Sequence, residues 1–323
     1  MRRRELIILL GGAALLHAPM SRAQEPGRVY RLGVMLRGSR QDIRFVALLD
    51  GLRQWGFVEG QNLRIEGRFS MPSEEDPEIA AALAASKVDA IVTVSNSSTR
   101  AAQKATRTIP IVTVADDLVL AGLVSSLAHP GGNTTGVSIL ATELDGKRQE
   151  LLIELVPEAR RMAALADPNA TAPEQLRALQ DAAHLRGIEL STHIASTAEE
   201  IIPALNAAQM AGAQVLNVLA SGLFNLNSQL IIDRTAVLRL PAIYQWPEIA
   251  EAGGLVAYGP RYAEIYRQPV ARQLAKIFLG VKPADLPVEQ PTKFELIVNL
   301  KTAKALGLTM SPSLLARADE VIE

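Results

Sequence analysis

The 323-residue sequence contains no cysteine, few aromatic residues and no excess of either charge. Without cysteine, the chain can form neither a disulfide scaffold nor a thiolate metal site, and it cannot be lipidated at an N-terminal cysteine. Lys and Arg number 33 against 34 Asp and Glu. The chain therefore lacks the basic excess that binding to a phosphate backbone requires, and nucleic acid is not an expected partner. Aromatic residues make up only 4%, so a stacked aromatic cage is not evident.

The first 23 residues have the order of a secretory signal. Three arginines at positions 2–4 precede an apolar run over residues 6–16, and Ser21 and Ala23 provide the small residues of a cleavage site. A membrane anchor is the alternative, but the run is about half of the ~20 residues that a spanning helix needs. We therefore expect a cleavable signal peptide, export to the periplasm by the Sec or the twin-arginine route, and a soluble mature chain that begins at Gln24.

Short apolar runs rich in Val, Ile and Leu alternate with helical patterns along the rest of the chain. Strands that are apolar on both faces are typical of a parallel sheet covered by helices on each side. The first set of predicted strands spans residues 30–36, 63–69, 88–94, 109–114 and 135–140. The second set spans residues 161–166, 188–194, 214–220, 241–244 and 255–258. The sequence thus predicts an α/β protein with two doubly wound parallel-sheet lobes.

Helical spacing is clearest in the set Phe45, Leu48, Leu49, Leu52 and Trp55, which share one face of a helix that ends before Gly56. Other helices are predicted near residues 173–186, 198–211, 226–238 and 263–279. Because this last helix and a strand at 294–299 follow two finished lobes, we expect the chain to cross between the lobes several times and to form a hinge. The expected division is 28–140 plus about 259–285 for the N-terminal lobe, and about 141–258 plus 286–323 for the C-terminal lobe.

Polar residues follow the predicted strands at the sheet edge where doubly wound folds bind ligands. After the strand at 88–94 come Ser95, Asn96, Ser97 and Ser98, whose hydroxyls and amide, with free helix N–H groups, suit a carboxylate or another anion. Helix capping is the alternative, although it accounts for only one of these residues.

Two carboxylates, Asp116 and Asp117, follow the next strand. They suit an ammonium or hydroxyl group of a ligand, or else they cap a helix that begins near Leu118. Further residues at the ends of strands or helices complete the predicted ring around the cleft, and Tyr244, Gln245 and Trp246 offer an aromatic wall and an amide on its rim. These further candidate ligand contacts are Arg37, Thr142, Asp167, Asn169, Ser221, Tyr244 and Gln245.

The sequence offers little support for catalysis. His129, His184 and His193 lack metal-ligand spacing, so neither a zinc site nor a His-activated nucleophile is expected. The Gly pairs at 131–132 and 253–254 lack the spacing of dinucleotide-binding loops, and no Walker pattern occurs. We therefore expect no catalytic residues, no metal and no cofactor.

Several motifs in a fixed order resemble one family. They include Gly56-Phe57-Val58-Glu59-Gly60-Gln61-Asn62-Leu63, Pro130-Gly131-Gly132-Asn133-Thr134-Thr135-Gly136, Lys147-Arg148 and Pro287-Val288-Glu289-Gln290-Pro291. The sequence is similar, from about Arg28 to the C-terminus, to ABC transporter substrate-binding proteins that include tryptophan- and tyrosine-binding members. The resemblance implies a type I periplasmic-binding fold and delivery of a solute to a permease. The chain departs from many relatives at Asp116-Asp117, where they carry Asp-Pro.

The favoured hypothesis is a periplasmic solute-binding component of an ABC importer. It would bind a small polar solute, an amino acid or related carboxylate, between its lobes, and its partners would be the permease and ATPase subunits. We expect a monomer. The alternatives are an exported hydrolase that uses carboxylates in the cleft and the sensor half of a regulator. A regulator would need a DNA-binding or signalling domain, for which we expect no room in this chain.

Overall fold

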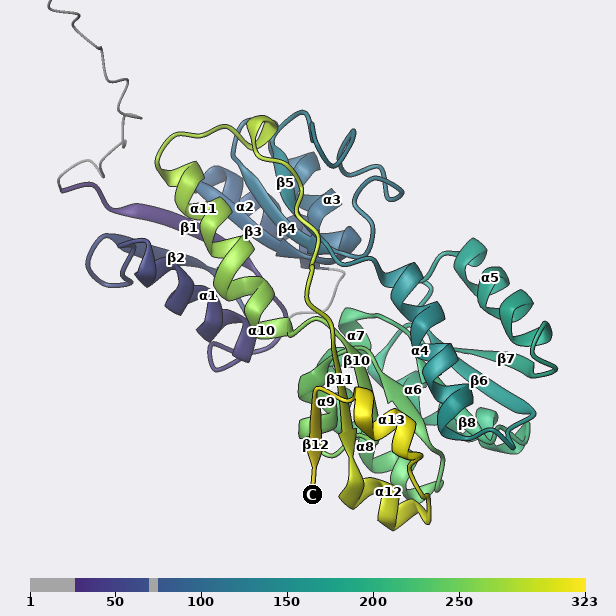
Figure 1. Ribbon diagram of the computed structural model, residues 1–323. Helices are drawn as coiled ribbons and strands as arrows, with labels where there is room; N and C mark the ends of the chain where they lie inside the picture. Colours follow the sequence, from purple (N-terminus) through teal and green to yellow (C-terminus); the bar gives the residue numbers. More distant parts are fainter. Residues whose placement is uncertain (1–26, 70–74) are drawn as a thin grey trace, which may run out of the picture.

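The computed structural model describes residues 27–69 and 75–323, and of Arg68, Ala141 and Thr142 it describes the backbone only. The predicted signal peptide and the expected first residue, Gln24, lie outside the described residues. Two α/β lobes make up the described chain, one with strands β1 to β5 and the other with strands β6 to β12 (Figure 1). This arrangement confirms the predicted fold class.

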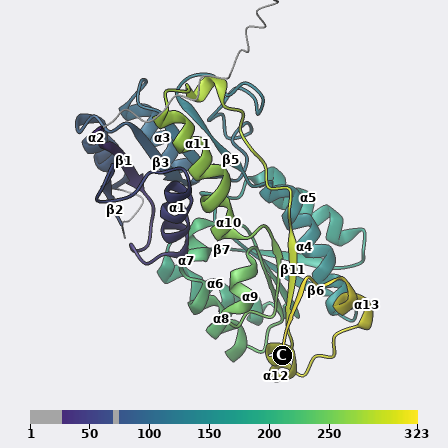
Figure 2. The ribbon, with the colours of Figure 1, turned by 60° about the vertical axis from the view of Figure 1, so that its left-hand side comes forward.

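The sheet of the first lobe is parallel throughout and has the strand order β2-β1-β3-β4-β5. Its strands are β1 (Tyr30–Met35), β2 (Leu63–Arg68), β3 (Ala90–Val94), β4 (Ile111–Ala115) and β5 (Thr134–Ser138). Every residue of β3, β4 and β5 is buried, as expected of strands that are covered on both faces. The helices α1 (Ile43–Gln54) and α11 (Ala271–Phe278) lie side by side on one face (Figures 1 and 2). The helices α2 (Asp76–Ala85) and α3 (Ser95–Ala105) pack together on the other face.

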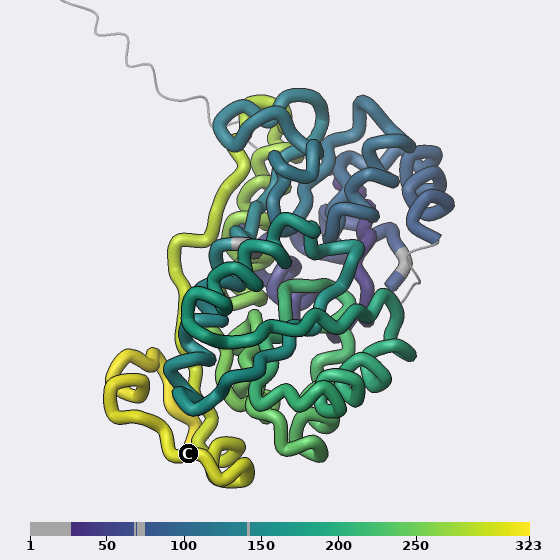
Figure 3. Tube along the Cα trace, turned by 90° about the vertical axis from the view of Figure 1, so that its right-hand side faces the viewer, coloured from purple at the N-terminus to yellow at the C-terminus, as the bar shows by residue number. Residues whose placement is uncertain are grey.

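The second lobe repeats this order and adds two strands at one edge. Its sheet runs β12-β11-β10-β9-β8-β6-β7, with β10 and β11 antiparallel and the other pairs parallel. The strands are β6 (Arg161–Ala166), β7 (Glu189–Ile194), β8 (Val215–Val218), β9 (Ala242–Tyr244), β10 (Val256–Gly259), β11 (Glu295–Asn299) and β12 (Glu320–Ile322). The edge strand β12 was not predicted. Figure 3 shows the C-terminal segment, in yellow, on the second lobe at the end farther from the first lobe.

Helices cover both faces of the second sheet. They are α4 (Ala141–Leu155), α5 (Pro173–His184), α6 (Ala198–Met210), α7 (Gly222–Leu226), α8 (Ser228–Val237), α9 (Pro247–Glu251), α12 (Leu300–Leu306) and α13 (Pro312–Arg317). Residues from α4, α12 and α13 bury apolar side chains in one cluster, and residues from α6, α8 and α9 do so in another. The predicted helices near 173–186, 198–211 and 226–238 are therefore present.

The chain crosses between the lobes three times. The first crossing runs from β5 to α4, and the second from β10 to α10 (Tyr262–Ile265), which packs on α1 of the first lobe. A π-helical segment, Tyr266–Val270, continues α10 into α11, so the predicted helix at 263–279 has three parts. The third crossing leads into β11.

The position of the third crossing follows from hydrogen bonds. Thr135 Oγ1 donates to the carbonyl of Leu286, and the amide of Glu289 donates to the carbonyl of Gly136, at 2.8 and 2.9 Å. Residues 286–289 thus bond to the first lobe, although the expected division gave them to the second. We propose that the boundary lies between Glu289 and β11.

Three local expectations were wrong. Trp55 caps the C-terminus of α1 and is 43% exposed, because it lies past the last turn of the buried stripe. The polar stretch that begins at Ser95 is not a loop before a helix but the first turn of α3 itself. Turns, not a helix, follow β4 at Leu118.

Candidate ligand-binding cleft

A cavity lies between the two lobes at the carboxyl ends of their strands. It holds about 450 Å³ of empty space, part of it open to solvent. The first lobe lines it from the ends of β3 and β4, and the second lobe from the loops after β6, β8 and β9. Its lining residues are Val94, Ser95, Asn96, Val114, Ala115, Asp116, Ile139, Asn169, Ala170, Ser221, Gly222, Trp246 and Tyr262. Both lobes therefore contribute polar and apolar surface to one site.

Five of the predicted ligand contacts line this cavity: Ser95, Asn96, Asp116, Asn169 and Ser221. Ser95 has a left-handed backbone, with φ of 76°, which is costly for a residue other than glycine. The side-chain oxygen of Asn96 is buried and has no hydrogen-bond partner among the described residues. Such an acceptor is available to a ligand that can donate a hydrogen bond.

Two predicted contacts, Asp167 and Gln245, act behind the cavity wall by holding Ser221. The hydroxyl of Ser221 donates to Asp167 Oδ2 at 2.6 Å. The side-chain oxygen of Gln245 accepts from the backbone N–H of Ser221 at 2.9 Å, and the side-chain nitrogen of Gln245 donates to the backbone carbonyl of Ser221 at 3.1 Å. Asp167 Oδ1 also accepts from the amide of Asn169 at 2.9 Å. The loops after β6 and β8 are thus fixed to each other at the cleft.

The other predicted contacts lie outside the cavity lining. Ser98 is buried and donates to the carbonyl of Val94, in the turn before it, which is a local helix bond rather than a ligand contact. Ser97 bonds to Asp76 at 3.3 Å on the side of α2, and Arg37 pairs with the same carboxylate at 3.2 Å.

Asp117 and Tyr244 also have structural roles. Asp117 Oδ1 accepts from two amides of the following turn, both at 2.9 Å, which is the capping alternative weighed above. The hydroxyl of Tyr244 lies 3.0 Å from that of Thr235, so this ring points into the second lobe and forms no wall of the cleft. Thr142 lies in the first turn of α4, and its side chain is outside the described part of the structure.

Asp116 is the titratable group that the cavity perturbs most. Burial, with a smaller contribution from the neighbouring carboxylates Asp145 and Asp167, raises its pKa to about 8, while Arg148 opposes the rise. Arg148 is itself paired with Asp145 in the interior of the second lobe and donates to the carbonyl of Tyr258 at 3.0 Å. Without a positive partner, a carboxyl in these surroundings keeps its proton near neutral pH. A cationic group in the cleft would restore the charge.

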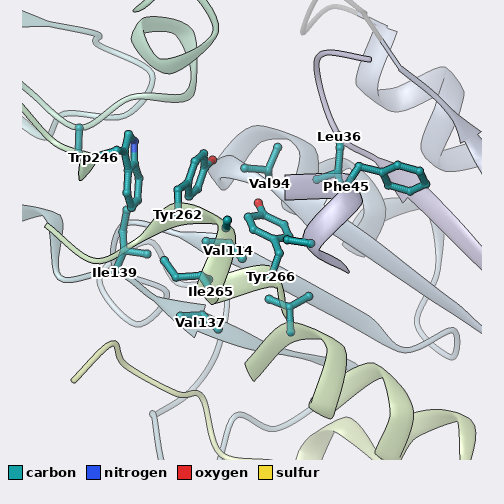
Figure 4. Close-up of a cluster of buried hydrophobic side chains, with 14 of the residues drawn as sticks. Leu36, Phe45, Val94, Val114, Val137, Ile139, Trp246, Tyr262, Ile265 and Tyr266 are labelled. Atoms are coloured by element: carbon teal, nitrogen blue, oxygen red, sulfur yellow. The ribbon is translucent and has the colours of Figure 1, made fainter. Parts of the chain in front are cut away.

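The aromatic wall of the cavity comes from Trp246, which the sequence placed on the rim of the cleft, and from Tyr262, which was not predicted. Their rings stack with centroids 4.0 Å apart and an interplanar angle of 16°, and both residues are 5% exposed. Figure 4 shows the Tyr262 ring beside Trp246, with Val114 and Ile139 nearby. The low aromatic content therefore did not preclude a stacked pair. Tyr262 lies just after the second crossing, so only the topology brings it to the cleft.

The described part of the chain provides no sign of a metal centre or a membrane span. Within residues 27–69 and 75–323, no group of three or more His, Asp or Glu side chains has the arrangement of a metal site. In the same residues, no helix has both the length and the apolar character needed to cross a bilayer.

Comparisons with known proteins agree with this geometry. A family model described as "ABC transporter substrate binding protein" matches residues 34–322. A tyrosine-binding protein of Clostridioides difficile is 30% identical over 267 residues, which are 80% of this chain and 75% of that protein.

Two solved structures share the fold. A conserved domain protein from Vibrio cholerae has a TM-score of 0.83 and 27% identity, over 91% of this chain and all of that one. An ABC domain from Streptococcus pneumoniae in complex with L-Trp has a TM-score of 0.82 and 23% identity, with the same coverage. Both are structures of the same two-lobed architecture.

Proposed function

Because this chain belongs to the family of ABC transporter substrate-binding proteins, we propose that it binds an α-amino acid with an apolar or aromatic side chain between its lobes. One observation carries the proposal: a single interlobe cavity combines a half-buried carboxyl of raised pKa, neutral hydrogen-bonding groups and a stacked aromatic wall. Those are the complements of an ammonium, a carboxylate and an apolar side chain. The tyrosine-binding relative and the L-Trp complex support the same class of ligand.

The ammonium group would bind at Asp116. Three carboxylates and one guanidinium act on this position, so the local charge favours a cation. The ion pair would form in a partly desolvated site, where charge-assisted hydrogen bonds are stronger than on the surface. This assignment places the ligand's amine, not its carboxylate, beside Asp116.

The ligand carboxylate would bind neutral donors on either side of the cleft. Ser95 and Asn96 supply a hydroxyl and an amide from the first lobe, and Asn169 supplies an amide from the second. Ser221 is less available because Asp167 already accepts its hydroxyl proton. A ligand held by donors from both lobes favours the closed arrangement, since only that arrangement offers all of them together.

The apolar side chain would pack against Trp246 and Tyr262, with Val94, Val114 and Ile139 around it. Burial of an aromatic side chain contributes about 1.5–3 kcal/mol, and ring contacts add about 0.5–1.5 kcal/mol. We also propose that the protein works in the periplasm, delivers its ligand to an ABC permease with an ATPase subunit, and performs no chemistry on it.

Thermal shift and calorimetry with matched ligands test the proposal. L-Trp, L-Tyr, L-Phe and L-Leu should stabilise the mature chain, because a ligand that binds only the folded state raises the free energy of unfolding. Indole-3-propionate, which lacks the amine, should bind much more weakly than L-Trp. Mass spectrometry should recover the amino acid unchanged after prolonged incubation.

The matched control compares neighbouring carboxylates. Asp116→Asn should abolish binding of the amino acid, whereas Asp117→Asn should leave it unchanged because Asp117 caps a turn outside the cavity. Equal loss in both variants, or equal affinity for L-Trp and indole-3-propionate, would contradict the assignment of Asp116. Conversion of the added amino acid would favour the hydrolase alternative.

A further inference from the structure

A buried arginine lies behind the aromatic wall without lining the cavity. Arg44, in the first turn of α1, is 1% exposed. Its guanidinium donates to both carboxylate oxygens of Asp42, at 2.7 and 2.6 Å, and to the carbonyl of Arg37. Its third contact is with Tyr262, whose hydroxyl accepts from Nη1 at 3.3 Å.

Stability alone does not explain a cation at this place. A positive charge near the N-terminus of a helix opposes the helix dipole. Replacing a buried ion pair by apolar residues is often neutral or stabilising, so such a pair is weak evidence for a stabilising role. The surrounding loop is nevertheless shaped around it: Gly38 has φ of 119°, and a side chain there would approach Asp42 Oδ2 to within 2.7 Å.

The guanidinium and Trp246 hold Tyr262 from different directions. The carbon Cζ of Arg44 lies 5.3 Å from the centroid of the Tyr262 ring, within the range of a cation–π contact. The Tyr266 ring meets Tyr262 edge to face at 5.6 Å. Trp246, from the second lobe, stacks on Tyr262 (Figure 4). The Tyr262 ring is therefore contacted by Arg44 and Tyr266 of the first lobe and by Trp246 of the second.

We propose that Arg44 is a positioning residue that holds Tyr262 in the plane required for stacking on Trp246, and so sets the aromatic wall of the interlobe cavity. The effect on ligand affinity rests on the proposed function, whereas the effect on the Trp246 stack does not. Arg44 itself does not touch the ligand. Its action on binding passes through the Tyr262 ring.

A spectroscopic experiment tests the positioning without any ligand. The chain has two tryptophans, so a Trp55→Phe background leaves Trp246 as the sole reporter. In this background, Arg44→Met should change the near-ultraviolet circular dichroism of Trp246 and increase its quenching by acrylamide. Arg53→Met is the matched control on the same helix, because Arg53 is exposed and pairs only with Asp50 among the described residues. The control should leave both signals unchanged.

Additional variants separate positioning from unfolding. Tyr262→Phe removes only the hydroxyl, so it should change the Trp246 signal in the same direction as Arg44→Met does. Adding Arg44→Met to Tyr262→Phe should change the signal little further. Arg44→Lys keeps the charge and should restore part of the signal. The double variant D42N/R44M leaves no unpaired charge, which guards against a variant that fails to fold. An unchanged Trp246 spectrum in folded Arg44→Met, or in Tyr262→Phe if the former does not fold, would overturn the proposal.

Calorimetry with L-Trp then measures the functional consequence. Loss of the hydrogen bond from a charged donor should weaken binding about tenfold in both Arg44→Met and Tyr262→Phe. The two losses should not add, since both variants break the same contact. If wild-type protein bound none of the amino acids, the proposed function would fail while the spectroscopic result would still decide the role of Arg44. Wild-type affinity in folded Arg44→Met would refute its effect on binding.

Discussion

Replacement of Asp116 by asparagine should stabilise the ligand-free protein while it abolishes ligand binding. Burial raises the pKa of this carboxyl from 3.8 to about 8, so between these pH values the folded protein keeps a proton that the unfolded chain loses. The folded state then binds more protons than the unfolded state, and wild-type stability falls as pH rises. The amide of the variant does not titrate, so the variant avoids this loss.

The size of the effect follows from the width of that pH window. Each pH unit costs about 1.4 kcal/mol, so about four units give roughly 6 kcal/mol by pH 8. Because Asp116 keeps partial contact with solvent, which weakens the effect of burial, we expect about half of that value. The variant should therefore exceed the wild type by ~3 kcal/mol at pH 8, and the two should be similar near pH 4.

Urea unfolding of both ligand-free proteins across pH 4–9, followed by circular dichroism, measures this difference directly. The difference should grow between pH 4 and 8 and then level off. A difference that does not change with pH, or a wild type that gains stability relative to the variant as pH rises, would refute the reasoning. Calorimetry in buffers of different ionisation enthalpy provides a second check. Binding of an amine at pH 7 should release a proton, because Asp116 must ionise to pair with it.

Four further substitutions test the placement of individual residues. Ser97→Ala should leave the affinity for L-Trp unchanged in calorimetry, because this hydroxyl lies outside the cavity. A tenfold loss would instead make Ser97 part of the carboxylate site formed by Ser95 and Asn96. Tyr244→Phe should lower the free energy of unfolding by about 1 kcal/mol through loss of one buried hydrogen bond, again without a change in affinity. Gly51→Ala should destabilise the first lobe by about 1–3 kcal/mol, because a side chain there would overlap the backbone of the π-helical segment. Gly146→Ala, at a helical position with open space around it, should instead be neutral or stabilising by up to about 1 kcal/mol. Thermal unfolding of both glycine variants measures the two effects.

The sequence predicted the fold well because its strands are buried on both faces. Runs such as those of β3 and β4 have no polar face, so their periodicity indicates a covered parallel sheet directly. The strand β12 was missed because three residues with exposed or half-buried side chains carry no such signal. The hydrogen bonds of residues 286–289 to the first lobe could not be predicted, because the pairing of Val137 with Glu289 depends on tertiary contacts.

The cleft was harder to predict, because the position of a residue after a strand does not tell where its side chain points. Asp116 and Asp117 are neighbours, yet one lines the cavity and the other caps a turn. Ser97 and Ser98 likewise face away from the cavity because the polar stretch winds into a helix at once. Tyr262 comes shortly after the predicted strand at 255–258, but it lies past the second crossing, so its place at the cleft depends on where that crossing leads. Trp246, by contrast, was placed on the rim of the cleft by its position after the strand that became β9.

The three crossings also determine the order in which the two lobes can be completed. The π-helical segment and α11 cover the face of the first sheet that also packs on α1, yet they follow the whole of β6 to β10 in the chain. A chain that emerges from its N-terminus can form β1 to β5 early, but it must leave this apolar face open until β6 to β10 have been made. The first lobe thus gains its last helix after β6 to β10 but before β11 and β12, so the two lobes receive their last elements in alternation. Each lobe is therefore assembled from two stretches of chain that are separated by part of the other lobe.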